Sequence, residues 1–438
     1  MATKKRKAST QLERNDELAV PSTGAHRTLL EVVDSERYFP IHQYLWSVLP
    51  VKTAVALSQT CRQLRAAHLR TFNINQRLSY FVRDPAGLRS QLGKNGALIS
   101  GSFALQLLAQ KRWPDSDLDI FVEAGATTEE LHVYLQQIEH YRLKTTQTDG
   151  GYPMMLIKEV RTYHRSSSLD PSRAKIQLIV TQHAPMLGIM TGFYMTAVVN
   201  IISWNKAYAV FAKDTFIDNR TYMLQPLDAY FEGLLHKYNH RGRQLEEIMR
   251  REDHGQSTSI QPVRRLGDRF TWVVPLPTEN VQPPPQADLV LESSTFAMYW
   301  NKVQPWQEPG YATCASYQIS VKKFEHVGLK HQLIVASTGL DLDSQHPTWT
   351  DFLASRLNQH AKMQLIAMKP EERPEWFNQG LDDTDGMFLG LLELDDGVTI
   401  RSFKKPEGWK NFDEMIPLWF EQWLPGFRTD DCLFPTDG

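Results

Sequence analysis

The sequence predicts an α+β protein, in which a helical N-terminal segment precedes a mixed sheet with flanking helices and an additional α/β C-terminal region. Apolar residues at helical spacing predict helices in the N-terminal segment, as in the series Ala54, Leu57, Cys61 and Leu64. Apolar runs typical of strands follow at 117–122, 154–163 and 175–182. Further strand-like runs lie in a segment rich in tryptophan and tyrosine, 296–427.

The composition indicates an intracellular protein and narrows the classes of partner. The chain has 438 residues, of which 42% are hydrophobic and 22% are charged, an ordinary balance for a folded protein of two or three domains. Its net charge of −2 leaves nucleic acid open as a partner but does not support it, and no apolar run approaches the length of a membrane span. The 3 cysteines are odd in number and far apart, which favours a reducing compartment.

The first part of the chain divides into a tail and a helical segment. Residues 1–27 are predicted to be a disordered basic tail, without the apolar region of a signal peptide. The cluster Lys4-Lys5-Arg6-Lys7 is either a nuclear import signal or a solvated basic tail, so we expect a nuclear or cytoplasmic protein. Residues 28–95 are predicted to be helical. One helix opens at Phe39, and the Leu49-Pro50 step ends it and starts another.

The rest of the chain is organised around residues 99–125, which predict a turn, a helix, a turn and a strand. Gly101 and Ser102 precede an apolar-rich run that predicts a helix over 103–112, stopped by Pro114. A helix start of this kind offers free backbone donors and a serine hydroxyl to a phosphate group.

Two acids follow on the predicted strand. The period of two puts Asp117 and Asp119 on one face, while Leu118, Ile120 and Val122 point into a core. Two carboxylates about 6–7 Å apart at Cα suit magnesium, which prefers oxygen ligands and keeps substrate phosphates in its shell. A phosphate cradle followed by a pair of acids predicts phosphoryl or nucleotidyl transfer.

This order of residues resembles the nucleotidyltransferase superfamily, which has the polymerase-beta-like fold. The resemblance is carried by GALISGSFALQLL and SDLDIFV, although the spacer is at the long end for that family. It implies a domain at 96–225 in which Gly101 and Ser102 bind a nucleoside triphosphate, and Asp117 and Asp119 are catalytic acids that hold Mg²⁺. A wider stretch, including KIQLIV and FYMTAVVNIISWNKAYAVFAKDTF, resembles a group of filamentous-fungal proteins and implies no activity.

The third carboxylate of active relatives is missing from its expected place. In such relatives it lies on the strand that corresponds to 175–180, where this chain has Gln177. Glutamine is neutral, so it is a weaker metal ligand and cannot act as a base. Glu159 on the neighbouring strand is a substitute only in a different register. We therefore expect weak magnesium-dependent nucleotide binding at most, with transfer slow or absent.

Two more helices are predicted in this domain. Thr128 caps one helix, over 129–141, because two threonines before two glutamates suit a helix start. The apolar run 192–204 predicts a core helix. Asn200 within it either reaches the cleft or satisfies a buried backbone group.

The run FPIHQYLWSVLPVKTAVALSQTCRQLR resembles an F-box, a helical module that docks the adaptor protein of cullin-type ubiquitin ligases. The likeness includes the Leu49-Pro50 step and the segment 58–62. It lacks the acidic residue usual after the leading proline, here Pro40. The implied partner is a ubiquitin-ligase adaptor, and the alternative is a plain helical cap on the next domain.

Residues 226–286 are predicted to form a charged helix, over 230–252, and a proline-rich linker. His236 and His240 lie one turn apart on this helix without a third metal ligand nearby in sequence. Its basic residues form either a face for phosphate or RNA, or a surface with internal ion pairs. They are Lys237, Arg241, Arg243, Arg250 and Arg251.

Residues 287–438 are predicted to be an α/β region of unknown role. The segment 350–368 predicts a helix and a further strand, with Asp351 and Arg356 as surface or capping groups. Five acids are predicted to be solvated in loops: Asp341, Asp343, Asp382, Asp383 and Asp385.

The sequence thus supports two functions. In the first, the chain is a divergent nucleotidyltransferase-like protein. It binds Mg-nucleotide, and its transfer of the nucleotidyl group to an unknown acceptor is weak or absent. In the second, it is an F-box-type substrate adaptor of a ubiquitin ligase, with the transferase-like fold as a binding module.

Overall fold

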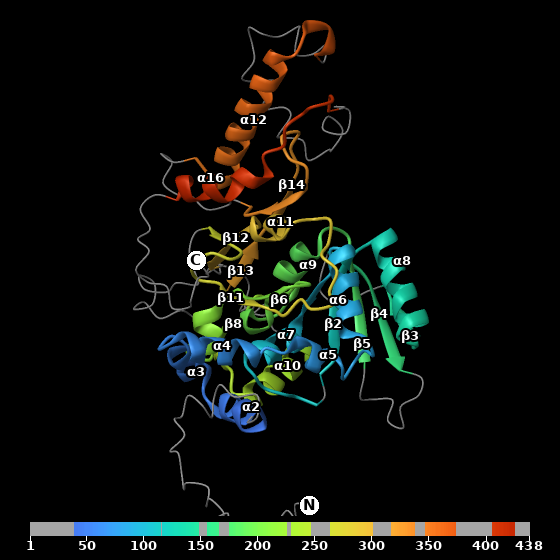
Figure 1. The fold of residues 1–438 in the computed structure, drawn as a ribbon, viewed down its shortest axis with the longest axis vertical. Coiled ribbons are helices and arrows are strands. Elements are labelled where there is room, and N and C mark those ends of the chain that lie inside the picture. The colour runs from blue at the N-terminus through green and yellow to red at the C-terminus, as the bar shows by residue number, and fades with distance from the viewer. Residues whose placement is uncertain are drawn as a thin grey trace, which may run out of the picture.

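An eight-stranded mixed sheet forms the centre of the structure, and a smaller C-terminal α/β part lies above it in Figure 1. This computed structural model describes residues 39–114, 116–148, 156–165, 175–225, 229–246, 263–300, 317–337, 347–373 and 405–424. Helices combined with a largely antiparallel sheet agree with the predicted α+β class. Within the described residues, no helix is both long and apolar enough to cross a membrane.

The strand order of the large sheet sets two acids beside a glutamine. In space the strands are β11 (Trp272–Pro275), β7 (Lys206–Ala209), β6 (Asn200–Ile202), β1 (Leu98–Ser100), β2 (Leu118–Glu123), β5 (Lys175–Thr181), β4 (Ile157–Arg165) and β3 (Tyr141–Gln147). The pair β2 and β5 is parallel, whereas the other neighbours are antiparallel. Asp119 of β2 stands directly opposite Gln177 of β5.

Both faces of this sheet are covered. One face packs with α5 (Ile74–Leu78), α6 (Pro85–Lys94), α7 (Gly101–Leu108) and α8 (Ala126–Val133). Leu118, Ile120 and Val122 lie in that core with no exposed surface, which confirms their predicted direction. The other face packs with α9 (Pro185–Gly192) and with strands of the C-terminal part.

The N-terminal segment is helical as predicted, with α2 (Phe39–Val48), α3 (Val51–Ser58) and α4 (Arg62–Arg70). Pro50 is the N-cap of α3, which confirms that the Leu49-Pro50 step separates two helices. A small core holds these helices together, formed by Trp46, Ala54, Leu64 and Ala67 with Leu45, Leu49, Leu57 and Cys61 packed against it.

The predicted core helix over 192–204 is wrong. Helix α9 ends at Gly192, a single turn covers Thr196–Val198, and the chain then enters strand β6. The residues of β6 are buried throughout because this strand lies between β1 and β7 and is covered on both faces. A strand buried on both faces is apolar at every position, so its pattern resembles that of a buried helix.

Three predicted helices have different ends in the structure. The helix expected over 103–112 is α7, which begins at Gly101 and ends at Leu108. The helix expected over 129–141 begins at Ala126 and passes into a π-helical turn, Tyr134–Ile138, so residue 141 begins β3 instead. Thr128 donates from its hydroxyl to the carbonyl of Glu123 (2.7 Å), while Gly125 is the N-cap.

The third of these is α10 (Ala229–His240), expected over 230–252. It ends two residues before Gly242, whose φ of +77° suits glycine at a helix end. A short strand, β9 (Gln244–Glu246), follows and pairs in parallel with β8 (Arg220–Tyr222). The segment predicted to be helix and linker therefore adds α10, β9 and the edge strand β11 to the structure around the large sheet.

The C-terminal part contains two small sheets and two helices. Strands β10 (Arg264–Arg265), β12 (Thr295–Trp300) and β13 (Tyr317–Ser320) form one sheet, and β14 (Lys322–Phe324) pairs with β15 (Leu333–Val335). The segment 350–368 is one helix, α12 (Trp349–Ala367), without the further strand predicted there. Thr348 caps it by accepting from the Asp351 amide, so Asp351 belongs to the cap as expected. Helix α16 (Ile416–Trp423) packs beside α12.

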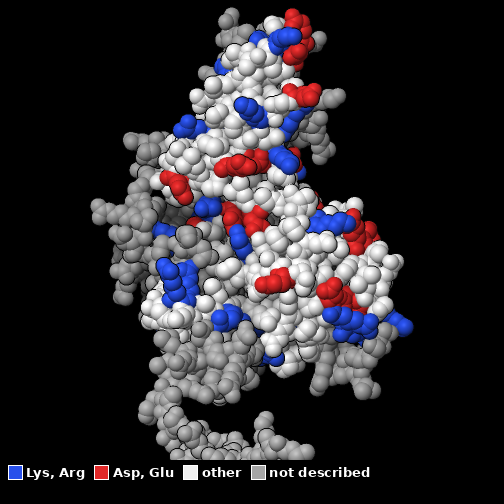
Figure 2. Space-filling model, in the orientation of Figure 1, with Lys and Arg blue, Asp and Glu red and all other residues white. Residues whose placement is uncertain are grey.

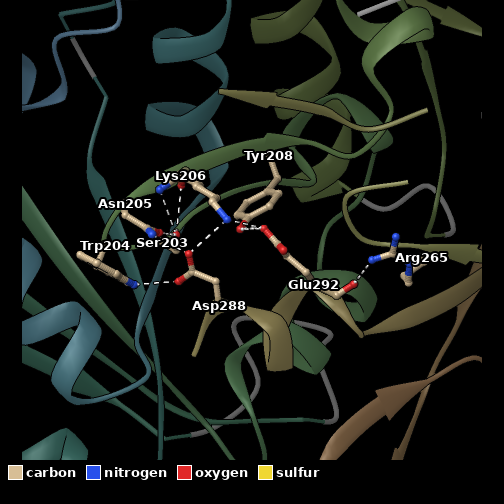
Figure 3. A network of polar contacts seen from close by, with 8 residues as sticks. All are labelled: Ser203, Trp204, Asn205, Lys206, Tyr208, Arg265, Asp288 and Glu292. Carbon is tan, nitrogen blue, oxygen red and sulfur yellow. Dashed lines mark hydrogen bonds and ion pairs between the residues drawn. The ribbon is translucent and has the colours of Figure 1, made fainter. Parts of the chain in front are cut away.

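A polar network joins the C-terminal part to the sheet (Figure 3). Asp288 and Glu292, on helix α11 (Asp288–Glu292), both bind Lys206, at 3.2 and 2.8 Å. Asp288 also accepts from the indole of Trp204 (2.9 Å), and Glu292 accepts from the hydroxyl of Tyr208 (3.0 Å). These contacts raise the pKa of the Lys206 ammonium in spite of its burial. The network fixes α11 onto the turn between β6 and β7.

Some predictions lie outside the described residues. They concern the tail 1–27 with its cluster Lys4-Lys5-Arg6-Lys7, the basic residues Arg250 and Arg251, and the loop acids Asp341, Asp343, Asp382, Asp383 and Asp385.

A histidine ties the N-terminal helices to the edge of the sheet. His68 of α4 stacks on the rings of Trp46 and of Trp272, at centroid distances of 4.7 and 6.3 Å. Burial, and then the charge of His42, lower its pKa from 6.5 to about 4. The folded protein therefore resists protonation of His68 in a pH range where the unfolded chain accepts the proton.

We predict that acid weakens the fold through this residue. Between pH 6.5 and pH 4 the unfolded state binds the extra proton, so His68 lowers the free energy of unfolding by about 3 kcal/mol as the pH falls through that window. Urea unfolding of the wild type and of His68→Phe at pH 7 and pH 4.5 measures the loss. His326, whose pKa is also lowered to about 4, is present in both proteins, so the difference isolates His68. An equal loss in both proteins contradicts the prediction.

Candidate functional site

The four predicted site residues line one cavity of about 220 Å³. Gly101 and Ser102 enter it from the start of α7, Asp119 from β2 and Asp117 from the residue before β2. The lining also includes Gln177, which the sequence placed at the position of the third acid, and the lysines Lys175 and Lys237. The cavity therefore combines a helix start, two acids, two lysines and an amide.

The turn from β1 into α7 places Gly101 against the second acid. β1 and β2 pair so that Ser100 stands opposite Asp119, and Gly101 then turns with a φ of +69°. A Cβ atom at residue 101 would lie 2.7 Å from Oδ2 of Asp119. Glycine is therefore required here both for its backbone conformation and for the space beside the carboxylate.

The first turn of α7 offers backbone donors to this cavity. Ser100 is the N-cap of the helix, but its hydroxyl donates to the carbonyl of Asn200 (2.5 Å) and makes no capping bond. The first amides of a helix have no partner within the helix, and the helix dipole adds a partial positive charge there. With the hydroxyl of Ser102 on the cavity wall, this turn has the features of a phosphate-binding site.

The two acids have different partners. The ammonium of Lys175 lies 2.7 Å from Oδ2 of Asp117 in a half-buried ion pair. Gln177 lies between the acids: with its amide nitrogen toward Asp119, it donates to Oδ1 (3.0 Å), and its oxygen accepts from the Lys175 ammonium (3.3 Å). A continuous chain of contacts thus runs from Asp117 through Lys175 and Gln177 to Asp119.

The surroundings of Asp119 shift its pKa. Burial, and then the neighbouring charge of Asp117, raise the pKa of the Asp119 carboxyl to about 7, against the opposing charges of Lys175 and Lys237. Near neutral pH this group is divided between its protonated and ionised forms. A protonated carboxyl is a poor metal ligand, so metal binding at Asp119 requires loss of its proton.

Among the residues that the structure describes, no third acid lines the cavity. Gln177 occupies the place beside Asp119, as the sequence predicted. Glu159 pairs with Val180, which puts its side chain on the opposite face of the sheet, where Arg161 donates to it (2.8 Å). Among the described residues, no group of three acidic, histidine or cysteine side chains could hold a metal.

These residues do not fit a resident magnesium ion as they are arranged. One acid, Asp117, is already paired with an ammonium, and the other carries a raised pKa. The neighbouring amide of Gln177 donates toward Asp119, where a metal-ligating carboxylate would accept. Magnesium at this site therefore remains a prediction that the donor set disfavours.

The other candidates on and near α10 do not line the cavity. The rings of His236 and His240 lie edge to face, with centroids 4.3 Å apart. Arg241 stacks on the ring of Trp113 (4.1 Å), and Arg243 is buried, where it donates to the carbonyl of Thr215. Basic and acidic groups are interspersed on the face in Figure 2, so the described residues show no broad basic face there.

Asn200 takes the second of its two predicted roles. Its side chain is 1% exposed, and its amide donates to the carbonyl of Ala197 (2.8 Å). It satisfies a buried backbone group and does not line the cavity.

The position of Lys175 beside the acids could have been predicted from the sequence. Lys175 precedes Gln177 by two residues on a strand, so both side chains share the face that meets Asp119. Lys237 was predicted only as one of several basic residues on a face for phosphate or RNA, and its place at the cavity depends on how α10 packs.

Comparison of the chain with protein-family models, with curated proteins and with solved structures found no match in any of the three. The resemblance to the nucleotidyltransferase superfamily therefore stays a prediction from the sequence.

We predict that Asp119→Asn stabilises the protein at pH 8. The folded-state pKa lies above the unfolded value of 3.8, so the folded state loses stability as the pH rises from about 4 to about 7. Removing the titrating group should recover roughly 2–4 kcal/mol at pH 8 and much less at pH 5. Thermal unfolding at the two pH values measures this, with Glu123→Gln, an exposed acid of the same strand, as the control. Equal effects at both pH values would show that Asp119 titrates normally.

Proposed function

We propose that the protein is a divergent nucleotidyltransferase-like protein that binds a nucleoside triphosphate and transfers its nucleotide weakly or not at all. One observation carries this proposal: the start of α7 and the acids Asp117 and Asp119 line the same cavity. The pairing of β1 with β2 brings a phosphate-type helix start directly beside an acid.

The shape of the cavity supports a nucleotide. Its lining combines Gly101, Ser102 and the charged groups with apolar and aromatic residues such as Phe193, Tyr194 and Leu234. A binding site for a nucleotide needs both, because the phosphates require donors and the base requires apolar or aromatic contact.

Transfer requires more than the cavity contains. Two-metal transfer uses several negative oxygen ligands to hold both ions and orient the incoming hydroxyl. Here Gln177 replaces the third acid, and Glu159 lies on the other face of the sheet. We therefore expect binding to be retained and the transfer step to be slow or absent.

Calorimetry with each nucleoside triphosphate and a labelled-transfer assay test the two halves separately. Gly101→Ala should abolish binding, because its Cβ atom would collide with Asp119. Glu159→Gln is the matched control and should bind like the wild type. Absence of binding in the wild type and in Gln177→Asp would contradict nucleotide binding. Robust transfer that Asp119→Asn abolishes would contradict a degraded site.

A second function, the F-box-type adaptor, is favoured by one separate observation. On α2, Ile41, Tyr44 and Val48 are 56%, 69% and 53% exposed, and their spacing puts them on one face of the helix. Pro50 is exposed and Leu57 is half-buried, so this face of the segment is not fully buried against the sheet. An exposed apolar helix face is a feature of protein-binding surfaces.

Capture of a recombinant ubiquitin-ligase adaptor tests this function. The double variant Tyr44→Asp, Val48→Asp should lose capture, because it places two charges on the apolar face while leaving the small core of α2–α4 intact. Met363→Asp is the control, since Met363 is a 60% exposed apolar residue on α12, remote from α2 in Figure 1. Equal capture by all three proteins, or none by the wild type, would exclude this role.

A further inference from the structure

Lys175 and Gln177 together engage the two acids that would have to hold a divalent cation. Its ammonium lies 2.7 Å from Oδ2 of Asp117 and 3.3 Å from the oxygen of Gln177, whose nitrogen in turn reaches Asp119. An ion bound by both acids would have to displace the ammonium from Asp117 and turn the amide of Gln177 away from Asp119.

The position of Lys175 is fixed by the sheet. It is the first residue of β5, and the parallel register with β2 sets Gln177 opposite Asp119. Lys175 lies two residues earlier on the same face, which brings it to Asp117, two residues before Asp119. The pairing of β5 with β2 thus sets Lys175 beside the residue that directly precedes β2.

The cavity also contains cationic groups and donors that could bind an anion. An ammonium carries three donors, and the contacts to Asp117 and Gln177 use two of them. Lys237 enters from α10, and the first turn of α7 adds its backbone donors. A phosphate group in this cavity meets positive charge and donors without any metal.

We propose that Lys175 takes the place of a divalent cation, so that the cavity binds the phosphates of a nucleotide without metal. This inference rests on the proposed nucleotide binding and adds that the binding needs no divalent cation. Asp117 serves to hold Lys175, and Lys175, Lys237 and the α7 amides hold the phosphates. The departures from the acid pattern of active relatives then act together: Gln177 removes a metal ligand, and Lys175 supplies the charge that the metal would bring.

The test uses the full chain with ATP as the probe, in EDTA and in magnesium. The wild type should bind ATP with the same affinity in both. Lys175→Met should lose at least about tenfold in EDTA, the expected loss for a charged hydrogen bond, and should regain affinity in magnesium. Lys175→Arg keeps the charge and should still bind in EDTA. Lys144→Met, which removes an exposed lysine of β3, is the matched control and should behave like the wild type.

A second measurement separates this inference from nucleotide binding itself. Titration with Mn²⁺ alone, followed by electron paramagnetic resonance, should show no bound ion in the wild type and a bound ion in Lys175→Met. Wild-type binding of ATP only in magnesium overturns the inference and leaves nucleotide binding standing. Loss of ATP binding in every condition removes the proposed function, and Mn²⁺ binding then decides whether Lys175 excludes a metal. Mn²⁺ bound equally by both proteins overturns the inference.

Discussion

The antiparallel pairing of β1 with β2 is the constraint on which the candidate site depends. It sets Ser100 opposite Asp119, so the chain must turn into α7 directly over a carboxylate. Only glycine fits at residue 101, where the φ is positive and the space for a Cβ atom is filled. The helix start, the acid and the glycine therefore form one unit, and a change in any of them disturbs the other two.

The parallel pairing of β2 with β5 adds the second half of the site. The register sets Gln177 opposite Asp119, and Lys175, two residues earlier on β5, contacts Asp117, the residue before β2. The neighbours are a lysine and a glutamine, which together neutralise one acid and hydrogen-bond the other. Whether such a cavity can bind a metal ion therefore depends on the residues opposite the acids as much as on the acids themselves.

Much of this could be predicted from local pattern. The alternation along β2 and the turn chemistry of Gly101 depend on neighbouring residues, and both were predicted correctly. The predicted helix over 192–204 failed because a strand covered on both faces loses its alternation. The turn of π-helix after α8 and the place of Lys237 could not be predicted, because both depend on packing between segments distant in the chain.

The stacking of His68 on Trp272 has a consequence for the order of folding during synthesis. Trp272 belongs to β11, which is the last strand of the large sheet in chain order, although it pairs at one edge beside β7. Helices α2–α4 leave the ribosome first, yet their aromatic contact with the sheet needs a strand that emerges after all the others. The N-terminal helices can therefore form their own small core early, but they must wait for nearly the whole sheet to be translated before they dock.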